Sequence, residues 1–174
     1  MTRLWRVAKR RYPPFTGDGG LHVGGRWHER GVRIVYTAGT KALSVLEFLA
    51  HLTPGSTPAV ATWWWLDLDE SRTLVETVDP GSLPPRWKGV RHLQATRTLG
   101  TQWIREGRTP VLRVPSVHVP GEFNYLVNPV HPLAAPLLAT AGGPEEFSID
   151  QRILAATWTA VSPRRRVRRV RRGG

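Results

Sequence analysis

The chain has 174 residues, 40% of them hydrophobic, and a formal net charge of +12. This length fits one domain with a single core. Because the chain has no cysteine, disulfides and thiolate metal sites are excluded. The basic start of the chain runs into Tyr12-Pro13-Pro14 without an apolar stretch. We therefore expect no signal peptide, no membrane span and a cytoplasmic protein.

Most of the positive charge lies near the C-terminal end. Seven arginines between positions 164 and 172 leave only +5 of the +12 for the rest of the chain. This predicts a domain over residues 1–160 and a disordered, arginine-rich tail over residues 161–174. Such a tail can bind nucleic-acid phosphates in a salt-dependent way. A solvated charge run is the commoner explanation, and an arginine-rich coding bias is another.

The first elements are a glycine-rich loop and a strand. Five glycines between Gly17 and Gly25 disfavour a helix or strand there. Residues 32–37 then alternate as a strand, with Val32, Ile34 and Tyr36 on one face. Tyr36 is thus either an aromatic platform for a ligand or a core residue.

A buried helix is predicted from Lys41 to Leu52, with Thr40 as its N-cap. Glu47 falls just outside the broad apolar face of this helix, within three or four residues of Ser44 and His51. A carboxylate at such a boundary can face a cleft. It can equally lie at the solvent edge and pair with His51.

Residues 57–68 have the composition of a strand and include three consecutive tryptophans at positions 63–65. Packing on both faces of the sheet is the commoner role for such residues, although a stacking platform for nucleic-acid bases is an alternative. Pro80 to Pro85 predicts a loop. His92 to Glu106 predicts a helix that Gly107 ends.

Two short strands end close to polar residues. Residues 111–114 predict a buried strand, which Pro115 ends before Ser116. The Ser116 hydroxyl can bond locally in a turn or contact a ligand. A second strand runs from Asn124 to a stop at Pro129, with Asn124 and Asn128 on one face. Either amide could orient a ribose or a loop.

Several chemistries find no support in the sequence. The six histidines lack the paired spacing of metal ligands, so we expect no metal. The glycine loop matches neither a dinucleotide-binding fingerprint nor a phosphate loop, and no serine lies in a nucleophile elbow. A site for an anionic nucleotide is better supported. Arg26 can hold a diphosphate, Ser116 can add a donor, and Glu47 can stabilise a sugar that becomes cationic.

Five motifs in order resemble those of the RES-domain toxins. They are Gly24-Gly25-Arg26-Trp27, Val35-Tyr36-Thr37-Ala38, Ala42-Leu43-Ser44-Val45-Leu46-Glu47, Leu112-Arg113-Val114-Pro115-Ser116 and Asn124-Tyr125-Leu126-Val127-Asn128-Pro129. The resemblance begins near Leu4-Trp5-Arg6 and extends to Arg152, so it covers nearly everything except the arginine tail.

The resemblance implies a toxin of a type II toxin–antitoxin pair, with an α+β fold related to ADP-ribosyltransferases. It implies a site that uses NAD as a substrate rather than a cofactor, with phosphate as a candidate co-substrate. The family roles fall on Arg26 and Glu47 as catalytic residues and on Arg26, Tyr36 and Ser116 as binding residues, to which we add Asn124. The implied partner is a helix-turn-helix, Xre-like antitoxin that blocks the site, with a homodimer within that complex as a further expectation.

One departure from the family is His28, where the family more often has asparagine; imidazole differs in size and protonation. The sequence also leaves the acceptor open. Phosphate would make the protein an NAD phosphorylase, water an NAD glycohydrolase, and a protein side chain an ADP-ribosyltransferase; we favour NAD degradation. A different class, a non-enzymatic nucleic-acid-binding module acting through the tail, is the remaining alternative.

Overall fold

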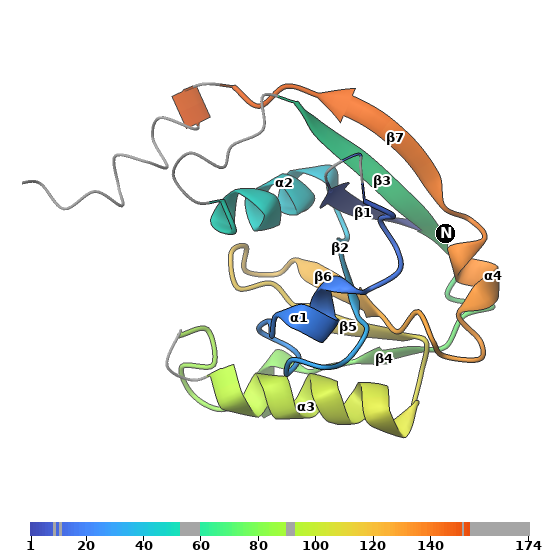
Figure 1. The fold of residues 1–174 in the computed structure, drawn as a ribbon. Helices are drawn as coiled ribbons and strands as arrows, with labels where there is room; N and C mark the ends of the chain where they lie inside the picture. Colours follow the sequence, from blue (N-terminus) through green and yellow to red (C-terminus); the bar gives the residue numbers. More distant parts are fainter. Residues whose placement is uncertain (9, 11, 53–59, 90–92, 151, 154–174) are drawn as a thin grey trace, which may run out of the picture.

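The computed structural model describes residues 1–8, 10, 12–52, 60–89, 93–150 and 152–153, and these build one seven-stranded sheet with flanking helices (Figure 1). The strands are β1 (Thr2–Ala8), β2 (Val35–Ala38), β3 (Ala61–Leu68), β4 (Val75–Thr77), β5 (Val111–Pro115), β6 (Phe123–Val127) and β7 (Gly142–Phe147). The helices are α1 (Gly19–His22), α2 (Lys41–Ala50), α3 (Leu93–Glu106) and α4 (Ala135–Leu138), with a 3-10 turn over Pro80–Ser82. This arrangement confirms the predicted compact α+β domain.

The sheet has the order β4-β5-β6-β2-β1-β3-β7 and consists of two well-paired halves joined at a narrow seam. β1 pairs with β3 along its whole length, and β2 pairs with β6 over four residues. β1 and β2, by contrast, pair at one position, between Trp5 and Ala38. Neighbouring strands are antiparallel except for β4 and β5. The two strands at the seam therefore diverge on either side of this single pair.

Each half of the sheet is covered by its own helix (Figure 1). Trp103 and Ile104 of α3 pack into one core cluster with Leu112 and Leu126 of strands β5 and β6. On the other half, Leu49 of α2 packs into a smaller cluster with strand β3 and Ile149. A third cluster spans both halves and joins them; it contains Leu4, Val35, Leu66, Leu68, Val111, Tyr125, Val127 and Leu137.

The helix after β2 begins where the sequence predicts. Thr40 is its N-cap, since the Thr40 hydroxyl accepts a hydrogen bond of 3.1 Å from the Leu43 amide. The helix ends at Ala50, slightly earlier than predicted, and it is less buried than expected because Leu46 is 44% exposed. The predicted apolar face is therefore only partly covered within the described residues.

α3 is held close to the segment that carries Arg26. Trp103 is fully buried, and its indole N–H donates to the Thr109 hydroxyl at 2.9 Å. A Cβ on Gly100 would overlap the carbonyl oxygen of Trp27, so only glycine allows this close approach of helix and loop. Gly107 then ends the helix with a φ of +58°, as its position predicts.

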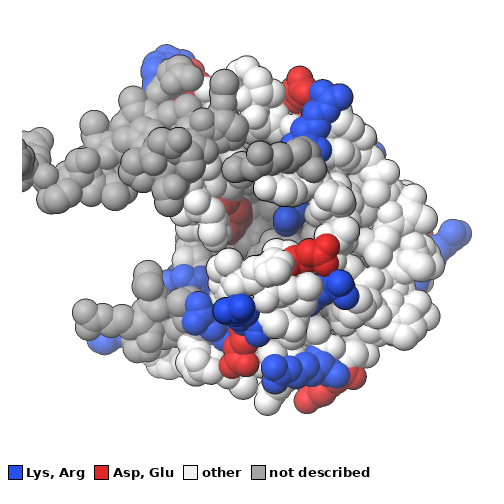
Figure 2. Space-filling view, viewed as in Figure 1, with Lys and Arg blue, Asp and Glu red and all other residues white. Residues whose placement is uncertain are grey.

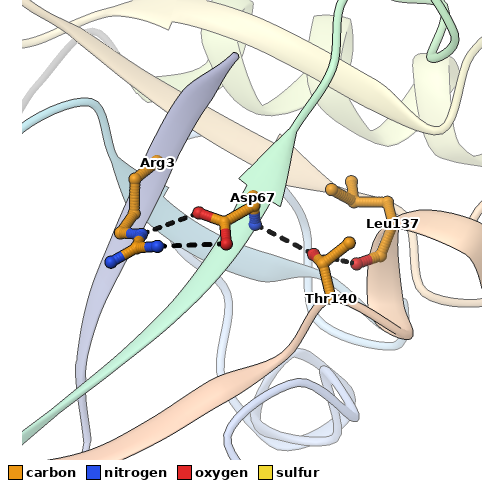
Figure 3. Close-up of polar contacts among 4 residues, drawn as sticks. All are labelled: Arg3, Asp67, Leu137 and Thr140. Carbon is orange, nitrogen blue, oxygen red and sulfur yellow. Dashed lines mark hydrogen bonds and ion pairs between the residues drawn. The ribbon is translucent and has the colours of Figure 1, made fainter.

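Two of the three consecutive tryptophans of β3, Trp63 and Trp65, contact other aromatic rings. The Trp63 ring stacks on Phe147 with centroids 3.7 Å apart, and Trp65 contacts Trp5 at 5.7 Å. These contacts fit the predicted packing role. Farther along the strand, Arg3 holds Asp67 by two hydrogen bonds of 2.7 and 3.1 Å (Figure 3).

The polar contact at Asp67 continues to the segment after α4. The Asp67 amide donates to the Thr140 hydroxyl at 2.9 Å, and that hydroxyl donates to the Leu137 carbonyl at 2.7 Å (Figure 3). Together with the pair between Arg3 and Asp67, this chain of hydrogen bonds fastens β1, β3 and the end of α4 to one another. This chain of hydrogen bonds lies near the start of β1, before the residue Trp5 that pairs with β2.

Several sequence-based expectations need correction. The glycine-rich segment contains the one-turn helix α1, which fits because Gly20 is buried against the Val32 carbonyl with no room for a side chain. The ladder of β2 begins at Val35 rather than at Val32, although Val32 and Ile34 do pack in the same cluster as Tyr36. The predicted loop at Pro80 starts with a 3-10 turn.

Strands β1, β4 and β7 were not predicted by the sequence patterns. No helix within the described ranges is long and apolar enough to cross a membrane. The start of the strand predicted from Thr57, and the predicted tail over residues 161–174, lie outside the described residues. The disorder of that tail and its contact with nucleic acid therefore stay predictions.

Candidate active site

A cavity of about 620 Å³ opens between the two halves of the sheet. Its walls come from the 24–28 loop, the seam strands β1 and β2, helices α2 and α3, and the start of β6. Figure 2 shows this face of the molecule hollowed, with acidic and basic side chains at the hollow. The cavity brings together four of the five predicted site residues: Arg26, Tyr36, Glu47 and Asn124.

Glu47 projects from α2 toward the opposite half of the sheet. Its Oε1 accepts a hydrogen bond of 2.6 Å from the Asn124 side-chain amide, and its Oε2 lies 3.6 Å from Nε2 of His118. His51 does not pair with the carboxylate, because its Nδ1 lies 2.7 Å from the Glu47 backbone carbonyl. The solvent-edge pair considered from the sequence is therefore wrong, and the carboxylate faces the cavity.

Asn124 orients this carboxylate from β6. The side chain is 7% exposed, and its donor is committed to Glu47, while its buried Oδ1 has no hydrogen-bond partner among the described residues. Asn128 is also buried, but its side-chain oxygen accepts from the Val130 amide at 3.2 Å. Of the two amides predicted to share a face, Asn124 serves the cavity and Asn128 serves a turn.

Arg26 lies on the opposite wall. One of its terminal nitrogens donates to the Trp87 carbonyl at 2.9 Å, which fixes the guanidinium and leaves other donors free to contact a ligand. Desolvation lowers the pKa of Arg26, and the charge of Glu47 acts in the opposite direction. Because an arginine pKa ordinarily lies far above neutrality, the group stays cationic at neutral pH despite this lowering.

Arg97 of α3 is a second cation in this wall, and sequence reasoning missed it. Its Nε donates to the Gly25 carbonyl at 2.7 Å, while the hydroxyl of Thr96 donates to the Arg26 carbonyl at 2.7 Å. α3 therefore holds the backbone of the arginine loop at two successive residues. Arg97 lies on a helix whose pattern looked entirely structural, which is why the sequence did not single it out.

Tyr36 and His28 form a buried polar pair behind the loop. The Tyr36 hydroxyl accepts from the Trp27 amide at 3.1 Å and lies 2.8 Å from Nδ1 of His28, whose Nε2 lies 3.0 Å from the Val23 carbonyl. Since a carbonyl only accepts, Nε2 carries the proton and Nδ1 accepts from the tyrosine. Burial lowers the pKa of His28 and raises that of Tyr36, so both groups stay neutral near pH 7.

The hydrogen bonds of this pair define what Tyr36 can offer a ligand. The hydroxyl is fully committed to the loop, so the ring is the part of Tyr36 that can contact a bound molecule. His28, the departure from the family pattern, serves the folding of the loop, because it joins Val23 to Tyr36.

Arg6 of β1 is a third cation in the cavity wall, and the sequence gave no signal that distinguishes it from a surface arginine. One of its terminal nitrogens donates to the Tyr36 carbonyl at 2.9 Å across the seam. Its Nε is buried without a hydrogen-bond partner, and no carboxylate pairs with it in the described part of the chain. Burial lowers the pKa of Arg6 to about 10, so it keeps its charge at neutral pH.

Ser116, the fifth predicted residue, does not line the cavity. It is 2% exposed, and its hydroxyl accepts from the backbone amides of His118 and Val119, both at 3.1 Å. The hydroxyl therefore closes a turn that places Val117 and His118 in the cavity wall. His118 was missed because the sequence shows it only as one of six scattered histidines.

The cavity thus sets three guanidinium groups, those of Arg6, Arg26 and Arg97, around a single oriented carboxylate. No cluster of histidine, aspartate and glutamate that could hold a metal ion occurs among the residues that the structure describes. An anionic ligand with one end close to Glu47 is the molecule that these charges fit best.

Known structures share this architecture. The crystal structure of the M. tuberculosis MbcT–MbcA toxin–antitoxin complex contains a chain that superposes with a TM-score of 0.67, covering 91% of this chain and 89% of its own. At 14% sequence identity, this likeness concerns the fold alone.

Sequence comparisons are more specific. The "Prs ADP-ribosylating toxin" of a Sphingobium species is 40% identical over 136 residues, which is 75% of this chain and 84% of that protein. "Toxin Res" of Pseudomonas putida is 35% identical over 153 residues, 86% of this chain and 98% of that protein. The sequence model of the RES domain matches residues 3–150. The chain therefore belongs to the RES domain family of toxins.

Proposed function

We propose that this protein is the toxin of a toxin–antitoxin pair and consumes NAD by cleaving the bond between nicotinamide and ribose. The observation that carries this proposal is the juxtaposition of one oriented carboxylate, Glu47, with the guanidinium groups of Arg6, Arg26 and Arg97 in one cavity. The cavity's volume of about 620 Å³ lies in the range of small-molecule sites.

The arginines suit the diphosphate of NAD. Arg26 has donors left after its bond to Trp87, and a guanidinium can hold two phosphate oxygens at once. Arg97 adds charge on the same wall. Arg6 has no carboxylate partner among the described residues, and a buried cation without a counter-charge is costly unless a bound anion compensates it.

Glu47 suits the developing charge on the ribose. Nicotinamide leaves NAD as a neutral molecule, so positive charge builds on the anomeric carbon as the bond breaks. Since Asn124 holds Oε1 of Glu47, Oε2 is the oxygen that accepts a hydrogen bond from a ribose hydroxyl and stabilises this charge in the transition state. The Tyr36 ring provides the surface for stacking.

The remaining predicted residues act by positioning. Ser116 closes the turn that forms one wall, and Asn124 aims the carboxylate. The sequence predicted that Ser116 and Asn124 contact the substrate directly. In the proposed mechanism they position other groups instead. His28 keeps the 24–28 loop attached to Tyr36.

Bond cleavage is common to every acceptor, so the acceptor decides the final product. Phosphate or water would degrade NAD, which is the outcome favoured by the sequence. Transfer of ADP-ribose to a protein is the second candidate, and the name of the Sphingobium relative, an ADP-ribosylating toxin, supports it.

An antitoxin is the proposed partner, as the toxin–antitoxin complex of the structural neighbour suggests. We expect a helix-turn-helix, Xre-like protein that covers the cavity, a homodimer within the complex and a cytoplasmic location. Co-expression with the neighbouring gene and size-exclusion chromatography test the complex.

The direct test is NAD loss with purified protein, with and without phosphate, with nicotinamide, ADP-ribose and its phosphorylated form separated by chromatography. Nicotinamide should appear with wild-type protein and should be reduced at least tenfold with Arg26→Ala. His22→Gln, on α1 and outside the cavity, is the control variant. Intact NAD in every arm, including one with candidate protein acceptors, would contradict the proposed function.

A further inference from the structure

We propose that His118 is the base that takes a proton from a hydroxyl acceptor, water or an alcohol side chain, when that acceptor attacks the ribose. This inference rests on the proposed function and adds a catalytic residue to it. The Nε2 atom of His118 lies 3.6 Å from Oε2 of Glu47, the carboxylate oxygen that Asn124 does not hold.

The position of His118 suits contact with an acceptor. Its side chain is 37% exposed and lies in the cavity wall, so a molecule entering from solvent can reach the imidazole. His51 also lines the cavity and keeps Nε2 for a proton, but its Nδ1 is engaged with the Glu47 backbone carbonyl and its ring does not pair with the Glu47 carboxylate. The arginines of the site carry no basic lone pair at neutral pH. His118 is therefore the group beside the carboxylate that can accept a proton.

The turn that carries His118 is held on both sides. The Ser116 hydroxyl accepts from the amides of His118 and Val119, and the Ser116 amide donates to the Glu122 carbonyl at 2.9 Å. The Glu122 amide in turn donates to the Val119 carbonyl at 3.2 Å. The buried serine thus fixes the backbone from which the imidazole projects, although its own side chain lies outside the cavity.

The proposed step exchanges one bond at the anomeric carbon of the ribose for another. The bond between the anomeric carbon and the nicotinamide nitrogen breaks, and both electrons leave with nicotinamide. A lone pair of the acceptor oxygen forms the new bond to the anomeric carbon. The proton of that oxygen moves to the ring nitrogen of His118 that carries no hydrogen. The imidazolium that forms faces the Glu47 carboxylate, which stabilises it.

Phosphate provides the contrast that makes this inference testable. The phosphate dianion attacks through an oxygen that carries no proton, so it needs no base. Water and alcohols do need one, and a positioned base typically contributes a factor of about 10² to 10⁴. His118 should therefore matter for hydroxyl acceptors and not for phosphate.

The experiment compares wild-type protein with His118→Gln in two reactions, NAD hydrolysis without phosphate and NAD phosphorolysis with it. We expect hydrolysis to fall by about 10² or more and phosphorolysis to change less than about threefold. His22→Gln again serves as the matched control and should leave both rates unchanged. Thermal unfolding of each variant establishes that the fold is intact.

A second variant separates a base from a merely positional residue. In His118→Ala, added imidazole should restore hydrolysis in proportion to its concentration, because a free base can occupy the vacated space. Three outcomes would overturn the role of His118 while leaving NAD cleavage in place. His118→Gln could lose hydrolysis and phosphorolysis equally, or it could keep the wild-type rate of hydrolysis. The wild type could also turn over NAD with phosphate alone. A wild type that consumes no NAD with either acceptor would instead overturn the proposed function.

Discussion

The two walls of the cavity are built in different ways. On the α3 wall, Arg26, Arg97 and the pair of Tyr36 and His28 all bond to backbone atoms of the loop or its neighbours. On the α2 wall, the Glu47 carboxylate is aimed by one side-chain amide that reaches it from β6. The cations on this wall are thus fixed by backbone contacts, whereas the carboxylate is held by side chains from the other half of the sheet, the Asn124 amide and, at 3.6 Å, the His118 imidazole. This difference predicts that changes to the two walls have distinct kinetic consequences.

The largest effect is expected on the α2 wall. Glu47→Gln keeps the size of the side chain but removes the charge that stabilises the ribose cation, so kcat should fall by about 10² to 10³ with little change in KM. Steady-state kinetics of nicotinamide release measure both. A kcat within threefold of wild type would show that the carboxylate carries none of the proposed stabilisation.

The next effect distinguishes the α3 wall. Arg26→Ala removes a charged hydrogen-bond donor to the substrate, a loss of about 1.5 to 3 kcal/mol, so kcat/KM should fall by about 10- to 100-fold. Unlike the Glu47 variant, this one should raise KM, because the diphosphate is bound before and during the reaction. An unchanged KM together with a low kcat would place Arg26 in the chemical step instead.

Gly100 tests how far the α3 wall depends on close packing. In Gly100→Ala the new methyl group would overlap the Trp27 carbonyl, and the helix must move away from the arginine loop. We expect a loss of about 1 to 3 kcal/mol in the free energy of unfolding, measured with urea, and a higher KM. Gly19→Ala is the control, since nothing lies within 4 Å of its Cβ. Equal stability of the two variants would mean that the close approach is not required.

The smallest effect concerns pH. Burial lowers the pKa of His28 below 6.5, so at acidic pH the unfolded chain binds a proton that the folded chain resists. The contribution of neutral His28 to the free energy of unfolding is therefore fully present above about pH 7. It is lost progressively as the pH drops below about 6.5. Urea unfolding at pH 7.5 and 5.5 should show a smaller loss for His28→Asn than for wild type. An identical loss would rule out His28 as a source of the acid sensitivity.

The sequence predicted the parts of this molecule that local chemistry determines. Thr40 caps its helix, Gly107 ends the next one, and the strands at 111–114 and 124–127 form close to their expected bounds because short apolar runs end at proline. Arg26, Tyr36 and Glu47 meet in one cavity as the family resemblance implied, together with Asn124, which the strand pattern suggested, although their roles stay predictions.

What the sequence could not predict depends on long-range pairing. β1 is basic and resembles a solvated segment until β3 pairs with it along its full length, and only then does Arg6 reach the cavity. His118 and Arg97 gain their place from a turn closed by Ser116 and from the contact of Gly100 with Trp27. These residues had no motif of their own, because the geometry that places them in the cavity wall comes from other parts of the chain.

The most direct test of the central claim, that this cavity is an NAD site with an anion-binding wall and a separate carboxylate wall, is equilibrium binding of NAD to Glu47→Gln by calorimetry. We predict saturable binding with one site per chain that weakens at least tenfold when Arg26→Ala is added. Absence of binding to Glu47→Gln, or binding that the second substitution leaves unchanged, would contradict the claim.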